Sequence, residues 1–203
     1  MAAPTRTVSA VQPAAFLDRD GVINVDHGYL HRIEDFEFIA GVLPACHALA
    51  QAGYALVIIT NQSGIGRGRY SEADFHTLTA WMHERFSKAD APLAGVYFCP
   101  HHPTEALGAY RQSCACRKPA PGMLLKAADD LGLDLSQSLA FGDRARDLQA
   151  ARSAGIPHRI LLGTNGTEPP VELPDSQLAT ARYPSLAQAV AVLINPPKPI
   201  TNA

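Results

Sequence analysis

The hydrophobic and polar positions of the chain form two alternating kinds of segment. Uninterrupted apolar runs rich in β-branched residues, of which 55–59 is the strongest, are typical of buried parallel strands. Segments with apolar residues every three or four positions predict helices with one buried face. One such helix, over 71–86, has Ser71 at its N-cap and Asp74 three residues later, which is a capping-box arrangement. Every predicted strand is followed by a predicted helix.

This alternation predicts an α/β fold with a doubly wound, mostly parallel, Rossmann-like sheet and right-handed crossovers. The predicted strands cover residues 14–17, 55–59, 95–98, 138–141 and 158–162, and the predicted helices cover 42–52, 71–86, 121–131, 147–154 and 185–194. The 203 residues suit a single domain, expected over 13–195, with no room for a large cap domain. We expect 1–12 to be a flexible arm and the proline-rich 196–203 to be a disordered tail.

Composition narrows the class of protein. The formal net charge of -2 argues against a general nucleic-acid or membrane-surface binder, because such proteins carry a strong basic excess. No apolar run approaches the ~18 residues of a transmembrane helix, and no basic segment followed by an apolar core marks a signal peptide. We therefore expect a cytoplasmic protein with no nucleic-acid or membrane partner. Without a long exposed apolar helix, a monomer is the default expectation.

Chemistry-bearing residues follow the first predicted strand directly. Asp18 and Asp20 stand one residue apart after an apolar run, and Gly21 comes next. In open α/β sheets, ligands bind outside the carboxyl ends of the strands, so a metal and an anionic substrate could meet both carboxylates there. The alternative is an acidic turn, in which Asp and Gly are common for backbone reasons alone.

Three further groups of polar residues lie at comparable places. Thr60 and Asn61 follow the second strand, Arg117 and Lys118 precede the helix that begins at 121, and Asp143 and Asp147 follow the fourth strand. For Asp143 and Asp147, the alternative role is capping of the helix that follows. A phosphoryl-transfer site needs a nucleophile, a proton shuttle, a divalent metal and fixed positive charge, and these groups supply each part.

The sequence Asp18-Arg19-Asp20-Gly21-Val22, with the three other groups in the same order, resembles the four motifs of haloacid-dehalogenase-like phosphohydrolases. That resemblance implies that Asp18 is the nucleophile and Asp20 the general acid and base. It further implies that Thr60 and Lys118 bind the transferring phosphoryl group and that Asp18, the backbone carbonyl of Asp20 and Asp143 hold Mg²⁺. Asp147 would either hold the metal through water or orient Lys118.

A second metal site is indicated by a cluster of cysteines and histidines. Cys99, Cys114 and Cys116 fall in one loop with His101 and His102, whereas Cys46 lies on the apolar face of a predicted helix and is expected in the core. In a cytoplasmic protein a disulfide is disfavoured, so three thiolates and one imidazole indicate a closed, structural zinc site. The pattern alone leaves either histidine as the fourth ligand.

Longer matches narrow the family. The runs 16–21, 24–29, 36–38, 60–64, 99–103 and 116–119 resemble those of the heptose-bisphosphate phosphatases. The resemblance implies that His101 is the zinc ligand and that Arg117 holds a distal phosphate. The substrate-binding residues that it implies are Asp26, His27, Gly28, Tyr29, Thr60, Asn61, Gln62, Ser63, Arg117, Lys118 and Arg144. Arg144 departs from relatives that carry Lys there. Arg67 and Arg69 lie in a glycine-rich turn, and a plain surface role is favoured for both.

The implied reaction is Mg²⁺-dependent hydrolysis of the C7 phosphate of D-glycero-D-manno-heptose 1,7-bisphosphate through an aspartyl-phosphate, in synthesis of bacterial lipopolysaccharide precursors. Histidinol-phosphate phosphatases carry the same motifs and zinc loop, and are the alternative. An acidic patch opposite the phosphate would favour histidinol phosphate, whereas a second arginine pocket would favour a bisphosphate. A metal-stabilised binding protein without turnover is the alternative of another class, against which the intact Asp18, Asp20, Lys118 and Asp143 speak.

Overall fold

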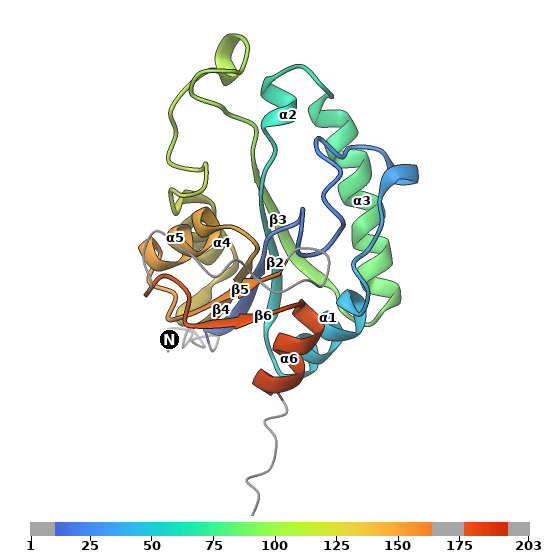
Figure 1. Cartoon of the computed structure of the whole chain (residues 1–203), viewed down its shortest axis with the longest axis vertical. Helices are drawn as coiled ribbons and strands as arrows, with labels where there is room; N and C mark the ends of the chain where they lie inside the picture. Colours follow the sequence, from blue (N-terminus) through green and yellow to red (C-terminus); the bar gives the residue numbers. More distant parts are fainter. Residues whose placement is uncertain (1–10, 164–176, 195–203) are drawn as a thin grey trace, which may run out of the picture.

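The structure is a computed structural model that describes residues 11–163 and 177–194, and its centre is one parallel sheet. The strands are β1 (Gln12–Leu17), β2 (Ala55–Asn61), β3 (Leu93–Cys99), β4 (Leu133–Gly142), β5 (His158–Leu162) and β6 (Ala181–Tyr183). They lie in the order β3-β2-β1-β4-β5-β6, and every neighbouring pair is parallel (Figure 1). This order is that of doubly wound nucleotide-binding folds and confirms the predicted fold class.

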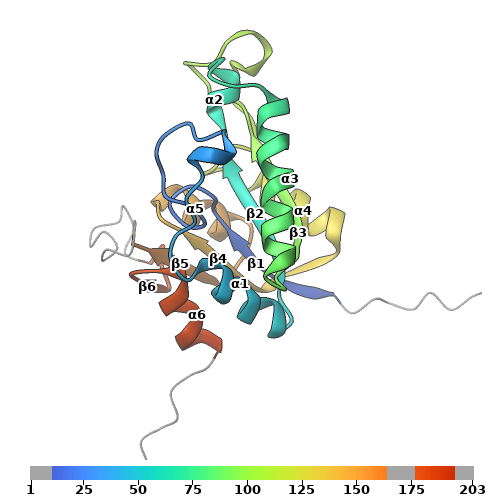
Figure 2. The same cartoon turned by 90° about the vertical axis from the view of Figure 1, so that its right-hand side faces the viewer.

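Helices cover both faces of the sheet (Figures 1 and 2). The α-helices are α1 (Val42–Gln51), α2 (Ser63–Gly66), α3 (Glu72–Lys88), α4 (Gly122–Leu131), α5 (Ala145–Ser153) and α6 (Leu186–Ile194), with short 3-10 helices η1 (Ile33–Asp35) and η2 (Gly108–Tyr110). Ser71 and Asp74 form the predicted capping box of α3. The longest helix therefore begins where the sequence places its N-cap.

Period-two alternation in the strands divides the core into two layers. Leu17 and Ile58 face one side of the sheet and pack with α1, α3 and α6. Phe16 and Val57 face the other side and pack with α4 and α5. Because all four side chains are at most 2% exposed, the central strands are buried on both faces, as their continuous apolar runs predict.

The strand order places ligand chemistry at one edge of the sheet. The order reverses between β1 and β4, which pair in parallel with Leu17 opposite Phe141. Asp18 directly follows β1 and Asp143 directly follows β4, so both carboxylates leave the sheet at the crevice where doubly wound folds bind ligands. The loop from β3 to α4 rises beside α2 above this edge (Figure 1), and its Leu107 backbone N–H donates to the Gly66 carbonyl at 2.7 Å.

Some elements differ from the sequence prediction. Strand β6 and the short helices α2, η1 and η2 were not expected, because three- and four-residue elements contain too few positions for a period to show. Strand β1 begins at Gln12, a residue that we had placed in the arm. Residues 1–10, most of that arm, and the predicted tail 196–203 lie outside the described residues. Within the described ranges, no helix is long and apolar enough to cross a membrane.

Candidate active site

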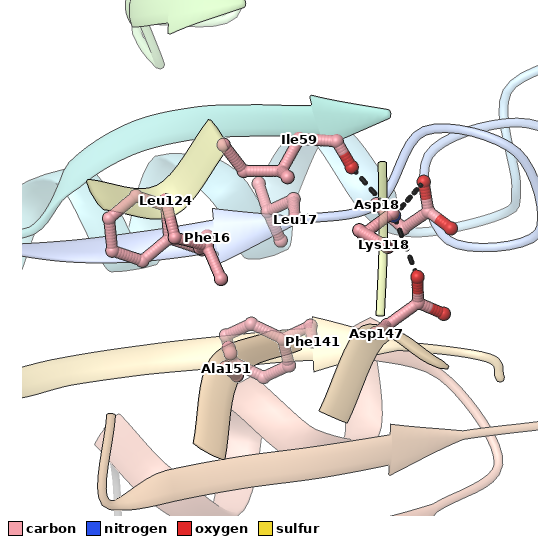
Figure 3. A pocket seen from close by; sticks show the side chains of 10 residues that line it. Phe16, Leu17, Asp18, Ile59, Lys118, Leu124, Phe141, Asp147 and Ala151 are labelled. Carbon is pink, nitrogen blue, oxygen red and sulfur yellow. Dashed lines mark hydrogen bonds and ion pairs between the residues drawn. The ribbon is translucent and has the colours of Figure 1, made fainter. Parts of the chain in front are cut away.

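A buried lysine joins two buried carboxylates at the carboxyl end of the sheet. Lys118 Nζ lies 2.9 Å from Asp18 Oδ1 and 2.7 Å from Asp147 Oδ1, and it donates to the Ile59 carbonyl at 2.8 Å (Figure 3). The side chains of Lys118, Asp18 and Asp147 are at most 5% exposed. Asp147 Oδ2 also accepts from the Arg144 backbone N–H at 3.0 Å, so Asp147 both caps α5 and orients Lys118. Helix capping, the alternative role of Asp147 in the sequence, is thus compatible with its contact to Lys118.

The carboxylates of this cluster carry more negative charge than Lys118 balances. Burial raises the pKa of Asp18 to about 7; Lys118 lowers it, while Asp147 and Asp143 raise it. The pKa of Asp143 is raised to about 6, mainly by burial and next by the charge of Asp147. One carboxylate oxygen from each aspartate lies within 4.8 Å of the others. A divalent cation between them would favour the charged forms that burial opposes.

Asp143 itself is the strongest indication of a cation. It is 3% exposed, and neither of its carboxylate oxygens accepts a hydrogen bond from any described residue, although Oδ2 lies 3.1 Å from Arg144 Nε in an ion pair. A buried carboxylate without hydrogen bonds is costly unless it coordinates a metal. Hard carboxylate oxygens are the ligands that Mg²⁺ prefers, so the residues present fit that ion.

Gly21 keeps this cluster compact. Its φ of +87° belongs to the region that favours glycine, and a Cβ there would lie 2.5 Å from Asp143 Oδ2. Any side chain at this position would displace the Asp143 carboxylate from Asp18. The glycine that follows the two aspartates in the sequence therefore allows the first and fourth motifs to approach each other.

Asp20 is held outside this cluster by three side chains. Its carboxylate accepts from Arg19 Nε and Nη2, from Asn24 Nδ2 at 3.1 Å and from Gln62 Nε2 at 3.0 Å. Arg19 is 1% exposed, and its Nη2 also donates to the Leu30 carbonyl at 2.9 Å. Since charge-assisted hydrogen bonds are the strong ones, they fix the direction of the Asp20 carboxylate.

Gln62 links Asp20 to the second motif. Its Nε2 donates to Thr60 Oγ1 at 2.8 Å as well as to Asp20, and its Oε1 accepts from the Tyr70 hydroxyl. Tyr70 thereby determines which end of the amide faces Asp20 and Thr60. The roles of Tyr70 and Arg19 were not expected from the sequence. A signal existed for Arg19, since period two places it on the same side of the chain as Leu17.

The substrate contacts implied by the resemblance fall into two groups. Asn61 is engaged within the protein, because its amide accepts from the Lys118 backbone N–H and donates to the Lys118 carbonyl, both at 3.1 Å. Ser63 is the first residue of α2. The other group is accessible, and comprises the exposed loop Asp26, His27, Gly28 and Tyr29, the exposed Arg144 and the half-buried Arg117. The second group is the more accessible to a ligand that arrives from solvent.

The predicted zinc ligands come together in the loop between β3 and α4. The Sγ atoms of Cys99, Cys114 and Cys116 lie 3.1 to 3.6 Å apart, and His101 Nδ1 lies 3.7 Å from Cys99 Sγ and 3.4 Å from Cys116 Sγ. Sulfur atoms around a tetrahedral zinc are about 3.8 Å apart, given a Zn–S distance of about 2.3 Å, so this cluster fits zinc. The other histidine, His102, faces Thr104 and Glu105 instead.

Comparisons with known proteins agree with this geometry. Residues 115–189 match a family profile described as HAD-hydrolase-like. The chain is 53% identical over 152 residues to the D-glycero-beta-D-manno-heptose-1,7-bisphosphate 7-phosphatases of Salmonella typhi and of Escherichia coli K12. Each match covers 75% of this chain, together with 81% of the Salmonella protein and 80% of the E. coli protein. The Vibrio cholerae protein of that name is 52% identical over 153 residues, covering 75% of this chain and 82% of its own.

Solved structures of heptose-bisphosphate phosphatases are similar to this chain as well. The D,D-heptose 1,7-bisphosphate phosphatase from B. bronchiseptica, complexed with magnesium and phosphate, matches with a TM-score of 0.74 and 32% identity over 90% of this chain and 98% of that one. The protein of that name from Burkholderia thailandensis matches with a TM-score of 0.61 and 26% identity over 91% and 99%. The fold and the aspartate and lysine cluster define a phosphomonoesterase of the haloacid-dehalogenase-like class.

Within that class, the chain belongs to the heptose-1,7-bisphosphate 7-phosphatase family. This confirms the family and the fold class that the sequence predicts. It also confirms the prediction of a phosphatase over that of a binding protein without turnover.

Proposed function

We propose that this protein hydrolyses the C7 phosphate of D-glycero-D-manno-heptose 1,7-bisphosphate to give the heptose 1-phosphate, in a Mg²⁺-dependent reaction. The observation that carries the proposal is the buried cluster of Asp18, Lys118, Asp143 and Asp147 in a chain 53% identical to phosphatases named for that substrate. Those relatives are named for the β anomer, which supports the β anomer as the substrate here.

Asp18 is the proposed nucleophile. Its carboxylate attacks phosphorus and forms an aspartyl-phosphate, while Asp20 donates a proton to the leaving sugar oxygen. Asp20, now a carboxylate, takes a proton from water, and that water cleaves the aspartyl-phosphate to release inorganic phosphate and restore Asp18. Lys118 and the Thr60 hydroxyl neutralise and orient the phosphoryl oxygens.

Two metals complete the proposal. Mg²⁺ would be held by Asp18, Asp143 and the backbone carbonyl of Asp20, and when bound it offsets the repulsion between carboxylate and phosphate. The unsatisfied oxygens of Asp143 support this ligand set. Zinc would be held by Cys99, His101, Cys114 and Cys116, and would keep the loop that leads to Arg117 and Lys118 in place.

We assign substrate recognition to accessible residues near the active site. Arg117 would bind the distal phosphate, and Arg144 and the loop Asp26, His27, Gly28 and Tyr29 would contact the sugar. Thr60, Asn61, Gln62 and Ser63 would line the phosphoryl site, with Asn61 and Gln62 acting through Lys118 and Asp20. We further propose that the protein is a monomer of the cytoplasm that supplies a lipopolysaccharide precursor, over a domain spanning 13–195.

The alternative substrate is histidinol phosphate, which carries one phosphate and an amine. The pair of arginines near the active site favours the bisphosphate, because Arg117 and Arg67 both lie beside the His101-His102 segment and could bind a second phosphate. The test is Mg²⁺-dependent phosphate release from heptose 1,7-bisphosphate and from histidinol phosphate, measured side by side at matched concentrations. We expect a higher kcat/KM for the bisphosphate, and a preference for histidinol phosphate would refute the assignment.

A further inference from the structure

Near the active site, an ion pair joins two segments that are distant in the sequence. Arg67, directly after α2, pairs through Nη2 with the carboxylate of Glu105, which lies in the zinc-site loop. His102 Nε2 lies 3.7 Å from the same carboxylate, and Arg117 Nη1 donates to the His101 carbonyl at 3.1 Å. The arginine expected to bind the distal phosphate and Arg67 therefore both lie beside the His101-His102 segment.

Arg67 does not have the surroundings of a surface charge. Its side chain is 24% exposed, and its Nε is buried without a hydrogen-bond partner among the described residues. The Tyr29 ring lies 5.7 Å from its guanidinium carbon, a distance typical of a cation–π contact. Tyr29 has a φ of 53°, which is uncommon outside glycine, and such backbone conformations cluster at functional sites.

The charged side chains beside the His101-His102 segment, which we call the rim, have more positive than negative charge. Arg67 and Arg117 place two guanidinium groups beside the His101-His102 segment, against the one carboxylate of Glu105. Glu105 is the carboxylate that Arg67 holds, and its side chain is 55% exposed and attached to a loop. An anion that entered between Arg67 and Arg117 would satisfy both guanidinium groups, and Glu105 could turn into solvent.

We infer that Arg67 is a second specificity-determining cation for the distal phosphate of a bisphosphate substrate, and that Glu105 occupies it until substrate binds. This inference rests on the proposed function. Arginine suits this task because its planar fork can donate two parallel hydrogen bonds to a phosphate, as it does to a carboxylate. Arg69 offers a control in the same turn, because it also lies over Tyr29, at 5.6 Å, but it is exposed.

The experiment compares Arg67→Gln, Glu105→Gln and Arg69→Gln with wild type on heptose 1,7-bisphosphate and on heptose 7-phosphate. We expect Arg67→Gln to lower kcat/KM for the bisphosphate about 10- to 100-fold, through KM, because a charge-assisted contact is lost. The same variant should leave kcat/KM for the monophosphate within about twofold. Glu105→Gln should lower KM for the bisphosphate, Arg69→Gln should change neither substrate, and Arg67→Lys should restore part of the loss.

The outcomes separate the inference from the proposed function. A wild-type protein that hydrolyses the bisphosphate well, together with an Arg67→Gln variant of unchanged KM, would overturn the inference alone. Equal losses on both substrates would also overturn it, because they would indicate a structural role. A wild-type protein that does not prefer the bisphosphate would overturn both. Glu105→Gln keeps the test valid if Arg67→Gln folds poorly, since an unchanged or raised KM in that variant contradicts competition.

Discussion

The ionised carboxylate of Asp143 should destabilise the protein whenever Mg²⁺ is absent, so Asp143→Asn should stabilise the metal-free fold. Burial raises the pKa of Asp143 from 3.8 to about 6, a shift of about two units. At about 1.4 kcal/mol per unit, this corresponds to a cost of about 3 kcal/mol. Because the folded-state pKa is the higher one, the cost is absent below pH ~4, grows between pH ~4 and ~6, and is complete above that range.

The neutral amide of Asn has no charge to desolvate, but it still buries polar atoms. We therefore expect Asp143→Asn to recover about 1–3 kcal/mol at pH 8, which is roughly 3 to 10 °C in melting temperature for a domain of this size. The measurement is thermal unfolding in buffer from which magnesium has been omitted. Chelators are unsuitable, because they would also remove zinc.

Addition of Mg²⁺ supplies the second half of this test. Wild type should gain stability with Mg²⁺ because the ion binds the folded state alone, whereas Asp143→Asn should respond little and should have lost turnover. The matched control is Asp129→Asn, which removes an exposed carboxylate from α4 and should behave as wild type. A metal-free Asp143→Asn protein less stable than wild type at pH 8, or one with an unchanged response to Mg²⁺, would refute the reasoning.

Three further predictions concern the nucleophile, the zinc cluster and the Asp20 contacts. Asp18→Asn should abolish turnover while circular dichroism shows an unchanged fold, and wild-type turnover would contradict its role as nucleophile. Cys114→Ser should lower bound zinc, measured by mass spectrometry, and also the melting temperature; unchanged values of both would exclude a structural zinc site. Gln62→Leu should lower kcat about 10- to 100-fold on sugar phosphates but much less on p-nitrophenyl phosphate, whose leaving group needs no proton. Equal losses on both substrates would show that Gln62 does not act through Asp20.

The sequence predicted the chemistry at the strand ends because that part of the fold follows from local pattern. A buried strand that stops at Asp18, and another that stops before Asp143, must leave a parallel sheet at the same edge. The three cysteines of the zinc cluster were likewise identifiable, because thiolate side chains at short spacing beside histidines have few other uses, whereas only the resemblance selected His101 over His102. In both cases, the type of residue and its position along the chain were enough to predict that it belongs to a site.

The contacts around Asp20 and Arg67 could not be predicted in this way. Gln62 reaches Asp20 only because β1 and β2 are neighbours, and its amide orientation depends on Tyr70, which lies beyond α2. Arg67 in a glycine-rich turn is typical of a solvated charge, and only the position of the loop that carries Glu105 gives it a partner. Such pairings depend on tertiary packing between loops that have no period of their own.

The proposed reaction is defined by its regioselectivity: the phosphate on C7 leaves and the phosphate on C1 stays. The most direct measurement is ³¹P NMR of the β anomer of D-glycero-D-manno-heptose 1,7-bisphosphate during incubation with the zinc-loaded protein and Mg²⁺. We predict that the signal of the 7-phosphate is replaced by that of inorganic phosphate, while the signal of the anomeric phosphate persists. Loss of the anomeric phosphate, or no release by a folded protein that contains both metals, would contradict the account.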